Sequence, residues 1–328
     1  MSLFTDASWI YWQLIQRSQM LRGSLAILTY HRVCARGDHG FLQDGGVPFV
    51  TPEVFAAQVA RLAGAGFEVV QLEQALQRRA LGERFARRTI AITFDDGYLD
   101  NLEAARVLHR AGLPATLFVA TDCLARTELL CEHRLFLALD RLGADATREL
   151  LADLVPARWR RRFVEHVLLR LPGAQRDFAH ERLGRALHAA GVDEPALCRE
   201  LYLGPEHLEQ LRALGVAIGS HGARHHPWTT LSEPEKEADL ARADSTLRAT
   251  LGDAVAPLFA SPYGSHRARD RRLLAGRGFR GALSTRFGSN GRGTDPLLLR
   301  RIAIGDGSAH RLAFLERSAR LAGVFDGL

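Results

Sequence analysis

The sequence has little cysteine, almost no lysine and no long apolar run, and each of these absences excludes a class of protein. Its four cysteines are widely spaced and form no C-x-x-C pair, so they are too few for a disulfide-dense secreted scaffold. No segment supplies the roughly 20 apolar residues that a membrane-spanning helix needs. The start of the chain lacks a basic region followed by an apolar stretch and a small-residue cleavage site. We therefore expect a soluble, cytoplasmic protein.

Arginine carries nearly all of the positive charge. Lys236 is the only lysine, and 43 basic against 37 acidic residues give a formal net charge of +6. The arginines lie in short scattered groups, such as those at 87–88 and 160–162, rather than in one stripe. Scattered arginines are typical of solvated helix faces, whereas a nucleic-acid site gathers its basic residues on one face. We expect no nucleic-acid partner.

An amphipathic helix is predicted at residues 1–23. Its apolar side chains include Trp9, Ile10, Trp12 and Leu21. We expect it to pack on the domain, with peripheral contact to a membrane as the alternative.

Apolar runs of strand length alternate with segments of helical periodicity. This alternation implies a parallel sheet with helical crossovers, and the number of units is too large for a small open sheet, so an α/β barrel is favoured. Strands are predicted at 24–30, 67–70, 89–94, 115–120, 216–219, 258–260, 281–284 and 298–304, and helices at 52–62, 72–81, 102–111, 235–251, 267–274 and 309–321.

The strand signal disappears between residues 121 and 203. This segment is rich in arginine, leucine and alanine with helical periodicity, so we predict a helical insertion carried on one strand-to-helix loop. The predicted organisation is the N-terminal helix at 1–23, a barrel formed by 24–120 and 204–328, and the insertion at 121–203. We expect the insertion to border a substrate cleft, because specificity in barrels is built in such loops.

Two adjacent carboxylates end the apolar strand Thr89-Ile90-Ala91-Ile92-Thr93-Phe94. Asp95 and Asp96 are followed by Gly97, which permits a tight exit from the strand. Neighbouring side chains point in different directions, so one carboxylate could bind a metal while the other takes a proton from water. The alternative is a turn that caps the following helix.

Two histidines four residues apart follow the strand expected at 216–219. In a helical turn, this spacing places His221 and His225 on one side, where they could bind a divalent cation together with a carboxylate from another strand end. His226 is the rival second ligand, but a separation of five residues rotates it off the shared face.

A third motif, Ser261-Pro262-Tyr263-Gly264, follows the strand expected at 258–260 and alone predicts only a turn. In this order, TFDDG, SHGARH and SPYG resemble the motifs of the polysaccharide deacetylase family, also called the NodB-homology domain or carbohydrate esterase family 4. The opening ILTYHRV and the later TPEVFAAQVARLAGAGFEVV resemble the start of its bacterial exopolysaccharide branch. The resemblance covers about 25–120 and 216–284.

The resemblance implies a distorted (β/α) barrel of about seven strands and metal-dependent hydrolysis of acetyl groups from N-acetylated sugars. Carried over residue by residue, Asp95 is the expected catalytic base, and Asp96, His221 and His225 are the expected metal ligands. Tyr263 is expected to offer its backbone N–H to the oxyanion. Three protein ligands leave positions for water and for the substrate carbonyl, as a catalytic site requires. The expected cofactor is a divalent metal, zinc, with cobalt and nickel as alternatives.

The chain departs from the family pattern in its third motif. That motif usually opens with an arginine that orients the catalytic aspartate, but Phe259-Ala260-Ser261 stands in its place. We expect Arg300 or Arg301 to reach the same carboxylate from another strand, and a solvated or structural arginine is the alternative.

The family's Leu-x-His motif, which supplies a general acid, is also absent near the C-terminus. His31 is the expected catalytic acid, because an imidazole titrates near neutral pH and strand ends face the active side of such barrels. His266 and His310 are further candidates, and a structural role for His31 stays open.

The leading interpretation is a cytoplasmic or membrane-peripheral deacetylase of an N-acetylated sugar, oligosaccharide or glycolipid precursor. The alternatives are a non-catalytic carbohydrate-binding relative and a hydrolase of another amide or an acetyl ester. The presence of Asp95 favours an enzyme, because a binding site has no need of the extra carboxylate.

Overall fold

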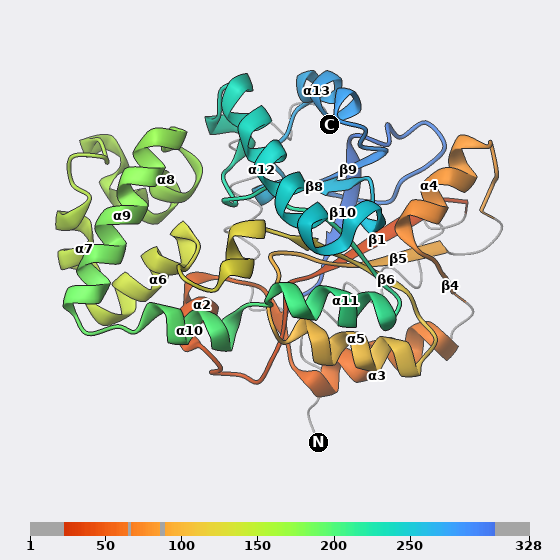
Figure 1. The fold of residues 1–328 in the computed structure, drawn as a ribbon, viewed down its shortest axis with the longest axis horizontal. Coiled ribbons are helices and arrows are strands. Elements are labelled where there is room, and N and C mark those ends of the chain that lie inside the picture. The colour runs from red at the N-terminus through yellow and green to blue at the C-terminus, as the bar shows by residue number, and fades with distance from the viewer. Residues whose placement is uncertain (1–22, 65–66, 86–88, 306–328) are drawn as a thin grey trace.

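A closed barrel of seven parallel strands forms the centre of a computed structural model that describes residues 23–64, 67–85 and 89–305 (Figure 1). Each barrel strand pairs with the next, and the last returns to the first: Thr29 lies opposite both Thr93 and Ala303. Apart from the exposed end of the sixth strand, the strands are mostly buried because helices cover the barrel and side chains fill it. The prediction of an α/β barrel of about seven strands is confirmed. The barrel strands are β1 (Leu25–Tyr30), β5 (Thr89–Phe94), β6 (Ala115–Val119), β7 (Val216–Ser220), β8 (Leu258–Ala260), β9 (Gly281–Phe287) and β10 (Leu299–Ala303).

The strand predicted at 67–70 is shorter than expected and is not one of the seven. It is β4 (Glu68–Val69), which pairs with the first two residues of β5. The last two residues of β5 pair with β6 on the same edge. Two short strands that we did not predict, β2 (Arg32–Val33) and β3 (Phe49–Val50), form a separate parallel pair. Runs of two residues are too short to show a periodicity in the sequence.

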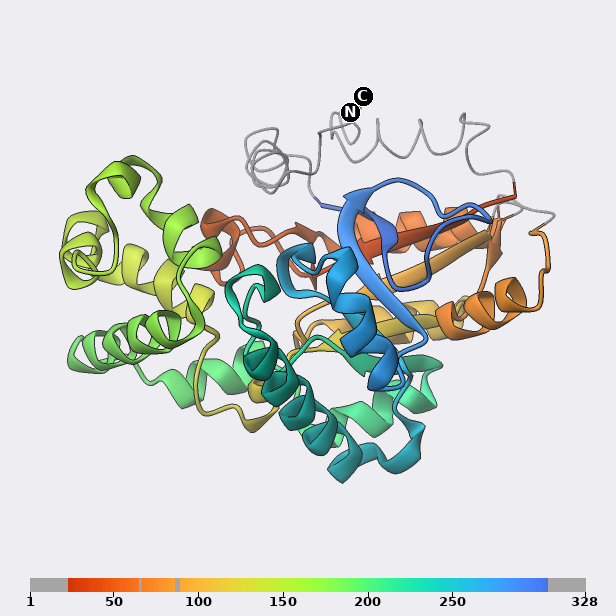
Figure 2. The same ribbon diagram turned by 90° about the horizontal axis from the view of Figure 1, so that it is seen from above.

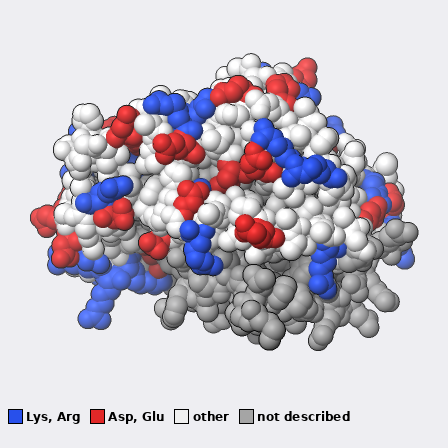
Figure 3. Space-filling model, turned by 90° about the horizontal axis from the view of Figure 1, so that it is seen from below, with Lys and Arg blue, Asp and Glu red and all other residues white. Residues whose placement is uncertain are grey.

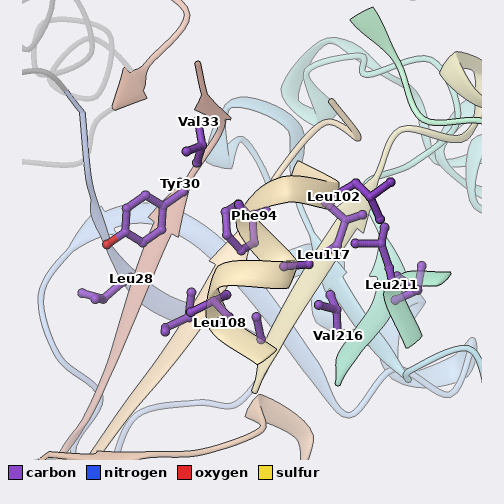
Figure 4. Close-up of a cluster of buried hydrophobic side chains, with 14 of the residues drawn as sticks. Leu28, Tyr30, Val33, Phe94, Leu102, Leu108, Leu117, Leu211 and Val216 are labelled. Atoms are coloured by element: carbon purple, nitrogen blue, oxygen red, sulfur yellow. The ribbon is translucent and has the colours of Figure 1, made fainter. Parts of the chain in front are cut away.

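Helices pack around the barrel, and their apolar faces form its outer core. Leu102 and Leu108 lie in one buried cluster with Phe94, Leu117 and Leu211 (Figure 4). The helix predicted at 267–274 begins as a 3₁₀ turn. The helix predicted at 309–321 and, apart from Gly23, the one at 1–23 lie outside the described residues. The helices here are α2 (Gly40–Gly45), α3 (Pro52–Gly64), α4 (Leu72–Ala80), α5 (Asn101–Arg110), α11 (Pro205–Ala213), α12 (Glu233–Leu251) and α13 (Arg271–Gly276), with 3₁₀ turns η4 (Trp228–Thr230), η5 (Gly252–Ala254), η6 (Pro262–Gly264) and η7 (Ala268–Asp270).

The helical segment 121–203 lies to one side of the barrel (Figures 1 and 2). Its helices pack around an apolar cluster that includes Leu135, Leu183 and Leu187, and Phe41 and Leu42 of α2 belong to the same cluster. The boundaries of this segment as a separate domain stay a prediction. Its helices are α6 (Cys131–Arg141), α7 (Ala144–Leu150), α8 (Phe163–Leu169), α9 (Gly173–Ala189) and α10 (Glu194–Leu201), with 3₁₀ turns η2 (Thr121–Ala125) and η3 (Ala157–Arg162).

Basic and acidic side chains are interspersed over most of the face shown in Figure 3. All four cysteines are buried and unpaired. Within the described residues, the helices are too short or too polar to cross a membrane.

Candidate active site

Three barrel strands deliver the predicted site residues to one end of the barrel. Asp95 and Asp96 follow β5, His221 follows β7, and the Pro262–Gly264 turn follows β8. Because these strands are parallel, their carboxyl ends meet at the same rim. The backbone N–H of His221 continues this pairing by donating to the carbonyl of Val119 at 2.9 Å.

Asp96, His221 and His225 converge on one point. Oδ1 of Asp96 lies 3.3 Å from Nε2 of each histidine, and the candidate ligand atoms of all three residues lie within 4.8 Å of one another. Oδ1 is buried and has no hydrogen-bond partner among the described residues. Burying a carboxylate oxygen is costly unless it is paired, so this arrangement fits a cation.

Nδ1 of each of the two histidines already makes a hydrogen bond. Nδ1 of His221 donates to the carbonyl of Ala260 at 2.7 Å, and Nδ1 of His225 bonds the carboxylate of Glu132. An imidazole that donates from Nδ1 can present the lone pair of Nε2 to a metal. One carboxylate oxygen and two imidazole nitrogens match the donor set that zinc prefers in open sites.

The charges around Asp96 keep its carboxylate ionised. Burial alone would raise the pKa of Asp96, but His225, His221 and His31 outweigh burial and hold this pKa well below its usual range. Burial alone would lower the pKa of His225, but Glu132 and Asp96 raise it above its usual value. Unlike charges in this buried site therefore stabilise one another.

The loop after β7 brings the histidines together without a helix. Gly222 and His225 have left-handed backbone conformations, with φ of 75° and 54°. The carboxylate of Asp239 in α12 accepts hydrogen bonds from the backbone N–H groups of Ala223 and Arg224, at 3.0 and 3.2 Å. The interpretation of the four-residue spacing as a helical turn was wrong, because this reversed and anchored loop produces the proximity instead.

Strained backbone concentrates at this site. The described chain contains five non-glycine residues with positive φ, and three of them are Asp96, His225 and Tyr263, with φ of 75°, 54° and 55°. Such conformations cost about 1–3 kcal/mol each and persist only where the surroundings impose them. Their clustering indicates that this rim is a functional site.

Asp95 stands beside the three converging residues and is held by an arginine. Nη1 of Arg301 donates to Oδ1 and Oδ2 of Asp95 at 2.8 and 2.7 Å, and Nε of Arg301 donates to the carbonyl of Ser284 at 2.8 Å. Oδ2 of Asp95 lies 3.9 Å from Nε2 of His221. Of the two arginines considered from the sequence, Arg301 makes the contact and Arg300 is exposed.

His31 faces the same centre from the end of β1. Burial lowers its pKa, Arg301 and His221 lower it further, and Asp95 and Asp96 oppose this shift. Its Nδ1 is buried and has no hydrogen-bond partner among the described residues. His31 is therefore close enough to both carboxylates to respond to their charge.

The other candidate histidines lie elsewhere. Nε2 of His266 bonds the carbonyl of Leu297 at 2.8 Å, and Nε2 of His226 lies 3.4 Å from Oδ1 of Asp177. His310 is outside the described residues. Neither His226 nor His266 belongs to the convergent group.

Tyr263 packs against His225. Its ring centroid is 4.8 Å from that of His225, and its hydroxyl accepts a hydrogen bond from Nη2 of Arg176 at 3.1 Å. The carbonyl of Tyr263 accepts a bond from the hydroxyl of Thr285 at 3.3 Å. The turn that carries the Tyr263 N–H is thus fixed at both its side chain and its main chain.

Sequence reasoning missed Glu132 and Arg176, which contact His225 and Tyr263 from the helical segment. No motif marks either residue. A usable signal was the run Glu132-His133-Arg134, three ionisable residues between apolar Leu130-Cys131 and Leu135-Phe136. The three ionisable residues are buried in α6. Ionisable residues within an apolar stretch indicate paired charges.

Comparisons with known proteins identify a family for this chain. A family model described as polysaccharide deacetylase matches residues 82–282, which is more than half of the chain. No curated protein matches the chain in sequence.

Several solved structures share the fold. The deacetylase PplD of Streptococcus pyogenes, solved in complex with acetate, has a TM-score of 0.58 and 15% identity, covering 89% of this chain and 97% of that one. IcaB from Ammonifex degensii has a TM-score of 0.55 and 18% identity, with 89% and 97% coverage. The deacetylase domain of BpsB from Bordetella bronchiseptica has a TM-score of 0.52 and 15% identity, with 86% and 96% coverage. Together with the family match over 82–282, the motifs and the barrel show that the chain belongs to the polysaccharide deacetylase family.

Proposed function

We propose that this protein is a metal-dependent hydrolase that removes the acetyl group from an N-acetylated sugar, oligosaccharide or glycolipid precursor. One observation carries the proposal: Asp96, His221 and His225 converge, and Asp95, held by Arg301, lies beside them without belonging to the converging group. Membership of the family supports a carbohydrate substrate. The structural likeness to IcaB and BpsB is a likeness of fold, and it agrees with the exopolysaccharide branch that the opening motif suggests.

Asp96, His221 and His225 would hold the divalent metal, with zinc the expected ion and cobalt or nickel as alternatives. When bound, such an ion polarises the amide carbonyl and makes its water more acidic. Oδ1 of Asp96 has no hydrogen-bond partner among the described residues, and each histidine is held through Nδ1, so Oδ1 and both Nε2 atoms are available for this role.

Asp95 is the proposed general base. Arg301 fixes both of its oxygens, so the carboxylate can accept a proton from the attacking water without turning. Water adds to the acetyl carbon, the carbon–nitrogen bond breaks, and acetate and a free amine leave. His31 is the proposed donor of the proton that the amine nitrogen takes, and the N–H of Tyr263 is the proposed hydrogen-bond donor to the oxyanion.

The test is acetate release by the purified protein loaded with zinc, cobalt or nickel, on a panel of N-acetylated oligosaccharides. Asp95→Asn should lower kcat by about 10²–10⁴-fold while keeping the bound metal, because it removes only the base. Asp96→Asn should lose the metal, as measured by elemental analysis after dialysis.

The alternatives give different results. Ammonia release from a primary amide, with no acetate from the N-acetylated panel, would identify another amide as the substrate. Glycan binding without turnover, unchanged by Asp95→Asn, would identify a carbohydrate-binding relative and overturn the proposal.

A further inference from the structure

The helical segment reaches the candidate metal site through one carboxylate. Glu132, in the first turn of α6, bonds Nδ1 of His225, a residue 93 positions away in the sequence. Glu132 is buried, so this contact is not a surface ion pair. We propose that Glu132 and Arg176 of the helical segment are positioning residues for His225 and Tyr263, an inference that rests on the proposed function.

Glu132 makes the two imidazoles of the site chemically different. His221 donates its Nδ1 proton to a neutral carbonyl, that of Ala260, whereas His225 donates to a carboxylate. A carboxylate behind a ligating histidine fixes its tautomer and ring orientation and makes its Nε2 a stronger donor to the metal. Glu132 therefore sets both the direction and the metal affinity of His225.

Arg176 compensates the buried charge of Glu132. Its side chain is fully buried, and its Nη2 donates to Oε2 of Glu132 at 2.9 Å. Nη1 donates to the carbonyls of Leu168 and Val167 at 2.6 and 3.3 Å, so the guanidinium has a fixed direction. A buried carboxylate is tolerated only when it is paired in this way, so Glu132 depends on Arg176.

The same guanidinium fixes the turn after β8. Nη2 of Arg176 also donates to the hydroxyl of Tyr263 at 3.1 Å, and the ring of Tyr263 packs against His225. Arg176 thus connects Glu132, and through it His225, with the turn that carries the Tyr263 N–H. Glu132 and Arg176 of the helical segment therefore hold His225 and Tyr263 of the barrel site.

Metal affinity tests the role of Glu132 without relying on turnover. The metal-free protein is titrated with zinc in competition with a chromogenic chelator. Glu132→Gln keeps the shape of the side chain but removes its charge, and we expect zinc binding about 10–100-fold weaker than in the wild type. Glu194→Gln is the matched control, because Glu194 pairs with Arg134 at 2.6 Å in the same segment and does not contact the site. It should leave zinc affinity unchanged.

Arg176→Lys tests the second connection. It keeps the positive charge but cannot make all the bonds of the guanidinium. We expect kcat to fall about 10-fold or more with KM nearly unchanged, since the turn that carries the Tyr263 N–H is loosened rather than the substrate site removed. An unchanged kcat would remove Arg176 from the proposal.

The outcomes separate this inference from the proposed function. A wild-type protein that binds no zinc contradicts the proposed function. A wild type that binds zinc, together with a folded Glu132→Gln that binds it equally well, overturns the role of Glu132. If Glu132→Gln does not fold, Glu132→Asp replaces it in the test. This variant keeps the charge opposite Arg176, but its side chain is too short to bond His225. A zinc affinity equal to that of the wild type would then overturn the proposal.

Discussion

Arg301 donates hydrogen bonds to both carboxylate oxygens of Asp95, although 206 positions separate the two residues. The third family motif lacks its usual arginine in this chain, and β10 provides the contact instead. The guanidinium cannot turn freely, because its Nε donates to the carbonyl of Ser284. An arginine from β10 therefore holds the proposed base in this chain.

Arg301→Lys should lower kcat by about 100-fold, because lysine presents a single point charge and cannot hold both oxygens of Asp95 in place. Zinc affinity should stay at the wild-type value, since Asp95 is not among the three converging residues. Steady-state kinetics and zinc titration measure the two effects.

Arg300→Lys is the control for this variant, because Arg300 is the exposed neighbour of Arg301. It should behave like the wild type. A wild-type kcat in Arg301→Lys would show that Asp95 needs no orienting arginine.

The barrel could be predicted because several of its strands are short, mostly apolar runs with clear boundaries, as at 25–30 and 89–94. Asp96, His221 and His225 could be proposed as neighbours because parallel strands deliver their ends to one rim. Arg300 and Arg301 could not be separated in the same way, because the pairing of β10 with β9 shifts register between Leu299 and Arg301.

Glu132 and Arg176 could not be found by this reasoning. The ionisable run 132–134 in an apolar stretch indicates paired charges, but it does not identify the partners, because these depend on how the helical segment packs against the barrel rim. The left-handed conformation of His225 could not be predicted either, because the loop that contains it is anchored by Asp239, which lies in α12.

His31→Gln should lower kcat by about 10²–10⁴-fold and leave zinc affinity unchanged, since it removes the proposed proton donor and no ligand. Burial lowers the pKa of His31, and the charges of Asp96 and Asp95 oppose this shift, so His31 is the candidate acid that lies near both carboxylates. The measurement is kcat for acetate release, with zinc content determined in parallel.

His266→Gln is the comparison, because Nε2 of His266 is engaged by the carbonyl of Leu297 and a glutamine amide can donate there as well. Its kcat should match the wild type. A large loss in His266→Gln with normal turnover in His31→Gln would transfer the role of the acid to His266.

His133, which follows Glu132 in α6, lies in a buried chain of hydrogen bonds. Its Nε2 is 2.9 Å from the hydroxyl of Tyr98, and its Nδ1 is 2.5 Å from the hydroxyl of Tyr202. Burial lowers the pKa of His133 to about 4. Glu132 and Asp96 act to raise this pKa, and the positive charges of His225 and Arg32 act to lower it. Burial also raises the pKa of both tyrosines, so they stay neutral partners.

The folded protein should therefore lose stability in acid through His133. The unfolded chain takes up this proton at the ordinary value of 6.5 and the folded chain only at about 4, so the contribution is complete above pH 6.5 and is lost as the pH falls toward 4. The loss is about 3 kcal/mol, at 1.36 kcal/mol per pH unit. The measurement is urea unfolding of wild type and His133→Gln at pH 7.5 and 4.5, in excess chelator so that metal release does not contribute. Groups that titrate in both proteins cancel, so the wild type should lose about 2–3 kcal/mol more than the variant between these two pH values, slightly less than the full amount because pH 4.5 lies above the folded pKa of about 4. Equal losses would mean that His133 is protonated as readily in the folded protein as in the unfolded chain.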